Sequence, residues 1–484
     1  MHKFAIFKGM IERNGKTYYP VIGLEIHAEL ATQSKMFCGC KNDPDEETPN
    51  KNTCPVCMAH PGTIPVPNQE AIASMVKIGL AVNGDIANFS EFDRKNYFYP
   101  DIPKGYQISQ YKYPIVSGGE LAGIKITRIH LEEDTATSKH DRGNFSLVDF
   151  NRAGVPLMEL VTEPVIHDSE TVTKFAKELQ LLLRTLGVGH ANIEKGEMRI
   201  EVNVSVSLDP EKFGTKTEVK NIGSVTAAGK AAAYEIERMI TLHEAGRVDE
   251  IVQETRGWDE NKQATFSQRK KENSNDYRYF PDPDLAKMYI HDMFDLEKVK
   301  SELPELPWQK RERYATDFEI KIDDIETYVS DMTLGKFFES VAEILKDKKS
   351  IQLASNYITS DMLGLLAKDE TLQFPSVENF ATLIQMNVAG DLNSRGTKDI
   401  LAMIVAKDEN PKDIAEREGL IQKNDPELLK SVAQKVIDAN PEKVAEYKSG
   451  KEALLMFFVG QIMKETKGSG NPQMIQEILK EMMQ

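Results

Sequence analysis

The sequence predicts an α+β fold with three parts: an antiparallel-sheet cradle domain, an all-α helical domain and a small all-α tail domain. Two observations predict this order. The first half of the chain contains segments in which apolar and polar residues alternate, a pattern typical of antiparallel strands that bury one face on helices. Past residue 300, apolar residues recur at helical spacing instead. We therefore expect a cradle at residues 1–300, a helical domain at 301–408 and a tail at 409–484.

Composition restricts the class of protein. The chain has 484 residues, of which 40% are hydrophobic and 28% charged, and its formal charge is -16. This acidity argues against a protein held on nucleic acid by bulk electrostatics, but it does not exclude an RNA substrate engaged through local patches. No apolar run reaches membrane-spanning length, and residues 1–20 lack the apolar core of a signal peptide. We expect a cytoplasmic protein with no membrane partner.

The first long strand organises the cradle. V-I-G-L-E-I-H-A-E-L places Gly23, Glu25, His27 and Glu29 on one face and apolar residues on the other. Successive residues of one face lie about 6.5–7 Å apart, so this row cannot hold one small ion by itself. A metal here needs ligands from neighbouring strands, and without them the row is a solvated face.

Four cysteines follow as two close pairs. The pairs, separated by thirteen residues, are Cys38 with Cys40 and Cys54 with Cys57. Short spacers let both sulfurs of a pair face one ion, so we predict a structural four-cysteine Zn²⁺ site. His60 is an alternative ligand in place of one thiolate. A redox C-x-x-C motif is the competing interpretation, but it leaves the other pair unexplained.

Helix signals and a polar-aromatic segment come next. Asn68 is typical of an N-cap before a helix that ends at residues 83–84, Asn-Gly. The segment F-D-R-K-N-Y-F-Y-P-D-I-P-K-G-Y-Q-I-S-Q at residues 92–110 is rich in turn formers, which predicts a loop-rich wall rather than a helix. Asp168 or Ser169 is expected to cap another helix.

Further strands carry acids on their polar faces. In I-K-I-T-R-I-H-L-E-E-D the apolar parity slips between Ile126 and Ile129, so we predict a bulge. The pattern leaves open whether Glu132 or Glu133 faces the groove. Glu159 lies in the apolar run L-M-E-L-V, where it is costly to bury unless it is paired or bound to a metal. Carboxylates gathered with a histidine in an open groove suit Mg²⁺ or Mn²⁺.

Six segments together resemble the GatB/GatE family, whose members are B subunits of tRNA-dependent amidotransferases. They are V-I-G-L-E-I-H-A-E-L, the polar-aromatic segment above, L-E-E-D, S-L-V-D-F-N-R-A-G-V-P-L-M-E-L-V, F-G-T-K-T-E-V-K-N and D-Y-R-Y-F-P-D-P-D. The resemblance implies a protein that uses ATP to phosphorylate the side-chain carboxylate of misacylated Glu-tRNA(Gln) or Asp-tRNA(Asn). Ammonia then displaces the phosphate and gives the amide, which is a carbon–nitrogen ligase reaction.

The resemblance also implies roles for individual residues. The matched catalytic positions are Glu25, His27, Glu133 and Glu159. The last three match the family's ligands for Mg²⁺ (or Mn²⁺), which favours Glu133 over Glu132. Glu25 matches an acidic position near the nucleotide and a second metal. Glu201 is a possible contact only.

Partners are implied as well. The chain contains no G-G-S-S-G-G-S amidase signature, so the resemblance implies that ammonia comes from a glutaminase, the A subunit, and that a small C subunit makes up a heterotrimer. Lys95 and Lys104 match basic residues of the ammonia route. The tail resembles a YqeY-like tRNA-binding domain, in which Lys464 and Lys467 would contact tRNA phosphates. From its residues alone, the tail is better explained as a small helical packing domain.

Two other functions are compatible with parts of the pattern. A non-catalytic adaptor would bind tRNA and tether a glutaminase, and its groove acids would be dispensable. The archaeal-type paralogue specific for Glu-tRNA carries a large inserted domain before its tail, for which 484 residues leave no room. The choice between Glu-tRNA(Gln) and Asp-tRNA(Asn) depends on the misacylating synthetases of the cell.

Overall fold

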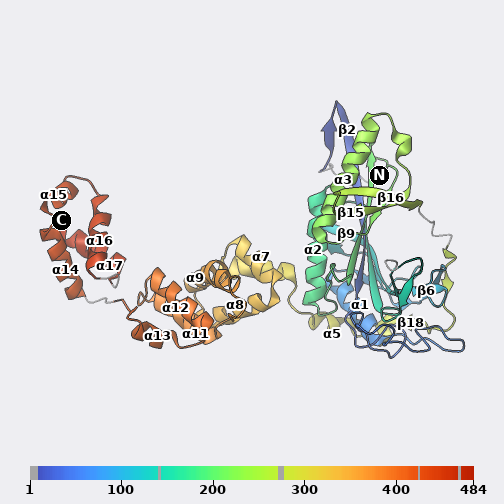
Figure 1. Cartoon of the computed structure of the whole chain (residues 1–484), viewed down its shortest axis with the longest axis horizontal. Coiled ribbons are helices and arrows are strands. Elements are labelled where there is room, and N and C mark those ends of the chain that lie inside the picture. Colours follow the sequence, from blue (N-terminus) through green and yellow to red (C-terminus); the bar gives the residue numbers. More distant parts are fainter. Residues whose placement is uncertain (1–8, 140–142, 271–276, 423–425, 467–469, 484) are drawn as a thin grey trace. The chain divides into compact units, whose positions relative to one another are not determined.

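The computed structural model describes residues 9–139, 143–270, 277–422, 426–466 and 470–483. The chain divides into two compact units, Met1–Pro307 and Trp308–Gln484, and each has its own fold (Figure 1). None of the helices in these described ranges is long and apolar enough to cross a membrane. The predicted boundary between helical domain and tail, at residues 408 and 409, stays a prediction.

One large sheet forms the first unit. Its strands lie side by side in the order β16 (Ala264–Lys270), β15 (Glu254–Asp259), β14 (Thr217–Lys220), β13 (Met198–Ser207), β2 (Lys16–Glu29), β12 (Pro156–Thr162), β9 (Ile124–Glu133), β7 (Val116–Ser117) and β3 (Asp85–Ile86). At its margins β1 (Ile11–Arg13) pairs with β2 and β8 (Glu120–Leu121) pairs with β9. Every pair is antiparallel except β14 with β15. The predicted α+β class is therefore confirmed, with one parallel pair added.

Helices cover the apolar face of this sheet. Ile22, Leu24 and Ile26 of β2 are almost completely buried, because the strand's alternation turns them all to that face. The covering helices are α1 (Gln69–Ala81), α2 (Ser169–Thr185) and α3 (Val225–Glu244). In Figure 1, α2 and α3 run together along the sheet. The shorter helical segments α4 (Ile290–Met293), α5 (Leu296–Ser301) and a 3₁₀ turn (Val248–Glu250) complete the unit.

Local signals in the sequence act as predicted. The Asn68 side chain accepts hydrogen bonds from the backbone N–H groups of Glu70 and Ala71, and Asp168 accepts one from Thr171. Both residues satisfy N–H groups that a helix start leaves free. The predicted bulge is also confirmed, because the register between β9 and β12 skips Thr127.

A hairpin covers part of the sheet's polar face. It consists of β5 (Asp93–Asn96) and β6 (Tyr106–Ser109), and β17 (Phe280–Pro281) pairs with β5. The Ser109 hydroxyl donates a hydrogen bond to Glu132 Oε2 at 3.1 Å, which joins the hairpin to β9. The prediction of an open groove is therefore wrong, since the hairpin encloses its acids. Two further pairs are β4 (Phe89–Ser90) with β18 (Met288–Tyr289) and β10 (Thr137–Lys139) with β11 (Leu147–Asp149).

The second unit is helical throughout its described part. Its helices are α6 (Pro307–Arg313), α7 (Ile322–Ser330), α8 (Met332–Leu345), α9 (Lys348–Asn356), α10 (Leu363–Leu366), α11 (Val377–Val388), α12 (Ser394–Ala406), α13 (Pro411–Arg417), α14 (Pro426–Asp438), α15 (Pro441–Lys448), α16 (Leu454–Glu465) and α17 (Pro472–Met483). Two π-helical turns, Tyr314–Phe318 and Tyr357–Met362, interrupt the series. The ring of Tyr328 stacks on that of Phe338 at 4.2 Å. The last four helices share a core that includes Leu429, Phe458, Ile462 and Leu479.

Close packing of α3 on α2 generates a testable prediction. A Cβ at Gly229 would overlap the Thr173 hydroxyl and lie 3.0 Å from the Ser169 carbonyl oxygen. We expect Gly229→Ala to lower the free energy of unfolding of the first unit by about 1–3 kcal/mol, because overpacking forces the two helices apart. Urea unfolding followed by circular dichroism measures this change. Gly223→Ala is the matched control, since a Cβ there meets nothing within 4 Å, and equal losses in both variants would contradict the packing argument.

Candidate metal centre and adjoining cavity

Three neighbouring strands bring four ionisable side chains into one pocket. The antiparallel register sets Glu159 of β12 opposite His27 of β2 on one side and opposite His130 of β9 on the other. Residues directly opposite each other point to the same face. Glu132 follows His130 by two positions and shares its face. We call His27, His130, Glu132 and Glu159 the two-histidine pocket.

The distances within this pocket are short but longer than hydrogen bonds. His27 Nε2 lies 3.3 Å from Glu159 Oε2 and 3.4 Å from Glu132 Oε1. His130 Nε2 lies 3.4 Å from Glu159 Oε2 and 3.8 Å from Glu132 Oε2. Of these residues His130, Glu132 and Glu159 are each almost fully buried, at 3%, 2% and 6% exposure. The pocket therefore holds converging nitrogen and oxygen atoms that are shielded from water.

Charge compensation governs the ionisation of the pocket. Burial alone would raise the pKa of Glu159 and Glu132, but the neighbouring imidazoles hold the pKa of both carboxyls below its usual range. Burial conversely favours neutral histidines, yet the two carboxylates raise the pKa of His130 to about 9 and that of His27 well above its usual value. Without a metal, protonated imidazoles balance the carboxylates. A cation that binds here must displace those protons.

Glu133 does not join this group. Its Oε2 accepts a hydrogen bond from Lys104 Nζ at 2.7 Å, and its Oε1 accepts one from the backbone N–H of Ile108 at 2.9 Å. Successive side chains of a strand point in opposite directions, so Glu132 and Glu133 cannot both face His27. Glu132, and not Glu133, therefore lies beside His27 and Glu159. The expected metal set of His27, Glu133 and Glu159 stays a prediction.

Cationic and aromatic side chains border the two-histidine pocket. Lys95 Nζ lies 5.0 Å from the ring centre of Tyr277 and 5.7 Å from that of Tyr97. Burial lowers the pKa of Lys95, but the combined charges of the neighbouring groups, that of Glu132 foremost, outweigh this effect and raise it on balance. Arg128 Nη2 lies 3.6 Å from Glu159 Oε1. Both cations therefore stand where they can attract an anionic ligand.

A second acidic group lies further along β2. Carboxylate oxygens of Glu25, Glu201 and Glu218 lie within 4.8 Å of one another. Lys220 Nζ donates a hydrogen bond to Glu201 Oε1 at 2.7 Å, whereas the other oxygen of Glu201 and the buried Thr217 hydroxyl have no partner among the described residues. Burial, and then the charges of Glu201 and Glu159, raise the pKa of Glu25. This group is a candidate for a second cation.

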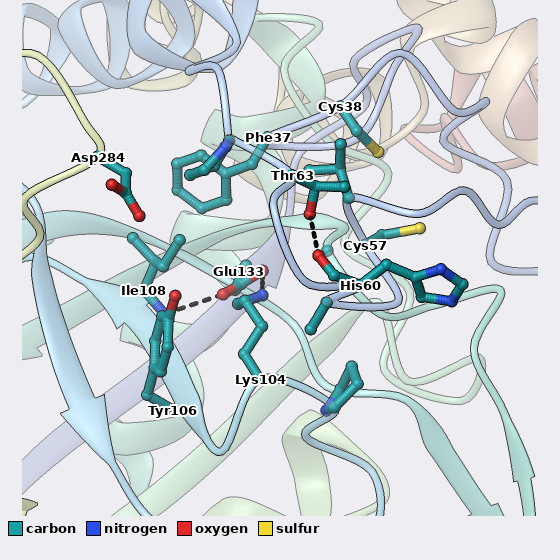
Figure 2. Close-up of a pocket in the computed structure, with 15 residues that line it drawn as sticks. Phe37, Cys38, Cys57, His60, Thr63, Lys104, Tyr106, Ile108, Glu133 and Asp284 are labelled. Atoms are coloured by element: carbon teal, nitrogen blue, oxygen red, sulfur yellow. Dashed lines mark hydrogen bonds and ion pairs between the residues drawn. The ribbon is translucent and has the colours of Figure 1, made fainter.

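A cavity of about 240 Å³ lies on the Glu133 side (Figure 2). Figure 2 shows the Lys104 side chain beside Glu133 in the lining of the cavity. The wall also includes Cys57, His60 and Asp284. The predicted ammonia-route residues thus occupy different surroundings, since Lys95 borders the two-histidine pocket and Lys104 lines this cavity.

The four cysteines come together as predicted. The Sγ atoms of Cys38, Cys40, Cys54 and Cys57 lie within 4.8 Å of one another. The Cys54 and Cys57 sulfurs are 3.9 Å apart, close to the edge of about 3.8 Å of a tetrahedron with 2.3 Å Zn–S bonds. The donor set fits Zn²⁺. His60 lines the neighbouring cavity but lies outside this group of ligand atoms.

The remaining predicted contacts lie in the tail. Lys464 lies in the last turn of α16, while Lys467 is outside the described residues.

The sequence analysis did not predict two residues of the candidate site, His130 and Lys220. The signal for His130 was present, because it shares the parity of Glu132 beyond the bulge at Thr127.

Comparison with known proteins gives the family. A model described as the GatB/GatE catalytic domain matches residues 20–295, and one described as the GatB domain matches residues 336–483. The B subunit of the aspartyl/glutamyl-tRNA(Asn/Gln) amidotransferase of Picosynechococcus is 42% identical, covering 96% of this chain and 97% of the relative. Its counterpart from Persephonella marina is 41% identical, covering 96% of this chain and 99% of the relative.

A plant relative extends the comparison beyond bacteria. It is the chloroplastic/mitochondrial B subunit of the glutamyl-tRNA(Gln) amidotransferase of Sorghum bicolor, which is 40% identical over 98% of this chain and 88% of its own length. Together the two family models cover most of the chain, and the relatives match it almost from end to end. The chain belongs to the GatB/GatE family of tRNA-dependent amidotransferase B subunits.

Proposed function

We propose that this chain phosphorylates and amidates the amino acid of misacylated Glu-tRNA(Gln), Asp-tRNA(Asn) or both. Its relatives carry the names of amidotransferase B subunits. The single structural observation that supports the proposal is the two-histidine pocket beside Lys95 and Arg128. A pocket of this kind combines metal ligands with cations, as chemistry between two anions requires.

The proposed reaction has two steps. A side-chain carboxylate oxygen of the amino acid attacks the γ-phosphorus of ATP, and the bond from that phosphorus to ADP breaks. Ammonia then attacks the acyl carbon, phosphate leaves, and the nitrogen loses a proton to give the amide. The first step is needed because a free carboxylate is a poor acyl donor, whereas phosphate is a good leaving group.

The chain's own residues would divide this work. His27, Glu132 and Glu159 would hold Mg²⁺ or Mn²⁺, which when bound neutralises charge on the phosphate oxygens. Lys95 and Arg128 would attract the anionic reactants into the pocket. The predicted metal role of Glu133 stays a prediction, and the pairing of Glu133 with Lys104 argues against it.

Glu25 would act at the nucleotide end of the same face. Its carboxylate groups with those of Glu201 and Glu218, and an oxygen-only set of this kind suits the Mg²⁺ that accompanies ATP. Lys220 adds a cation beside them. This arrangement would place the γ-phosphate of ATP toward the two-histidine pocket, where the carboxylate is to be phosphorylated.

Ammonia would arrive from a partner. We propose that a glutaminase, the A subunit, is its source and that a small C subunit is the third member of a heterotrimer. Lys104 and Glu133 form an ion pair across the cavity, and Lys95 stands at the pocket beyond it. Lys464 and Lys467 would contact tRNA phosphates, which requires no base recognition.

The first prediction of this proposal concerns ATP cleavage. In the complex with its partner subunits, Glu159→Gln should lower ATP cleavage dependent on misacylated tRNA by about 10²-fold or more, because it removes a charged ligand from the pocket. The affinity for tRNA should stay unchanged. Release of ADP, measured with and without misacylated tRNA, tests this expectation.

Glu120→Gln is the control for that variant. Glu120 is an exposed glutamate of β8, so the same loss of charge at this position should leave ATP cleavage as it is. If Glu159→Gln cleaves ATP at the normal rate, the chain is instead a tRNA-binding adaptor that tethers a glutaminase.

The second prediction concerns zinc. Cys57→Ala should lose the bound Zn²⁺ and lower the melting temperature of the first unit, because a structural zinc site contributes its binding energy to folding. Elemental analysis and thermal unfolding measure the two effects. His60→Ala should retain one Zn²⁺ per chain, since His60 lies outside the four-sulfur group. Loss of zinc in His60→Ala but not in Cys57→Ala would refute the four-cysteine assignment.

A further inference from the structure

We propose that His130 is a fourth ligand in the two-histidine pocket, and that the pocket is built for a divalent transition ion such as Mn²⁺ or Zn²⁺ rather than for Mg²⁺. The inference rests on the proposed function for the presence of a metal in this pocket. It adds one protein ligand, and with that ligand a preference among metals.

The surroundings of His130 differ from those of a histidine kept for packing. The residue is 3% exposed, and buried polar groups are normally hydrogen-bonded. Its Nδ1 has no partner among the described residues. Its Nε2 faces the carboxylates of Glu159 and Glu132 at 3.4 and 3.8 Å. The ring is therefore aimed at the same two carboxylates as His27.

The geometry matches the separation of ligands around one ion. The four distances between imidazole nitrogens and carboxylate oxygens run from 3.3 to 3.8 Å, beyond the range of about 2.7–3.2 Å for such hydrogen bonds. A tetrahedron with metal–ligand bonds of about 2.1 Å has edges of about 3.4 Å. An ion of this size therefore fits among His130, Glu132 and Glu159, whose ligand atoms lie within 4.8 Å of one another. His27 approaches the same two carboxylates from the neighbouring strand.

The donor set selects the class of metal. Mg²⁺ demands oxygen ligands in octahedral geometry and gives up its water reluctantly, so two imidazoles in an enclosed pocket suit it poorly. Imidazole with carboxylate suits transition ions such as Zn²⁺, and Mn²⁺ accepts the carboxylates readily. The carboxylates of Glu132 and Glu159 balance a divalent charge. Arg128 contacts Glu159, and Lys95 is close enough for the charges of both carboxylates to act on it, so these two cations can hold phosphate oxygens.

The backbone explains why these four groups meet. Glu159 is the central residue, because β12 lies between β2 and β9. Its register places one histidine on each neighbouring strand directly opposite it. Both imidazoles are thus positioned by the hydrogen bonds of regular strands, which hold a site more rigidly than loops do.

Pulsed electron paramagnetic resonance of bound Mn²⁺ tests the proposal without relying on activity. The purified complex with its partner subunits is loaded with one equivalent of MnCl₂ in the absence of ATP. We expect nitrogen couplings from two imidazoles in the wild-type complex and from one in His130→Asn. The affinity for Mn²⁺ should fall about 10-fold or more in this variant, and MgCl₂ should displace Mn²⁺ from the wild type only at an excess of about 100-fold or more.

His190→Asn is the matched control, because His190 lines a separate pocket near Glu197 and should leave both the couplings and the affinity unchanged. A single imidazole coupling in the wild type, or an unchanged spectrum in His130→Asn, would overturn the inference. The wild-type spectrum decides the matter even if the variant fails to fold. If no imidazole coupling is seen at all, both the inference and the metal position in the proposed function are wrong. If the wild type shows coupling from one imidazole, only the inference is wrong.

Discussion

The site depends on charge compensation between two carboxylates and two imidazoles across three adjacent strands. Without charged partners, the buried carboxylate of Glu159 on the middle strand would destabilise the fold, because an isolated buried charge costs several kcal/mol. The histidines on both sides supply the missing partners. The fold of the first unit positions this arrangement: strand register sets the groups opposite one another, and helices on the far face hold the register by burying Ile22, Leu24 and Ile26.

Strand β9 separates two chemical environments. Glu132 turns into the two-histidine pocket, whereas Glu133 turns toward Lys104 and the cavity beside the cysteines. One step along the backbone thus moves from the carboxylate of the two-histidine pocket to the ion pair with Lys104. Under the proposed function, this is the boundary between the place where the carboxylate is activated and the route by which ammonia arrives. The four-cysteine group would support the cavity side, since Cys57 lines the same cavity as Glu133.

Much of the fold could be predicted because it is encoded locally. The strand Met198–Ser207 alternates in burial from Met198 to Val204, and the caps at Asn68 and Asp168 act within three residues of themselves. The enclosure of the pocket could not be predicted, because it depends on where the hairpin of β5 and β6 docks. Two asparagines before proline behave differently: Asn471 accepts hydrogen bonds from the backbone N–H groups of Gln473 and Met474, whereas Asn440 makes no cap hydrogen bond and instead donates to the carbonyl oxygen of Val436.

The sequence did not predict which of Glu132 and Glu133 points into the two-histidine pocket. The bulge at Thr127 shifts the alternation of β9 by one residue, so the pattern before the bulge does not predict the faces after it. Family resemblance indicates which positions matter, but it does not indicate which way a side chain points.

The most direct test is transfer of labelled γ-phosphate from ATP to misacylated tRNA in the assembled complex. We expect Glu132→Gln to abolish transfer, while Glu133→Gln retains it and loses only glutamine-dependent amidation. Retention of transfer in Glu132→Gln with loss in Glu133→Gln would contradict this assignment of the two glutamates.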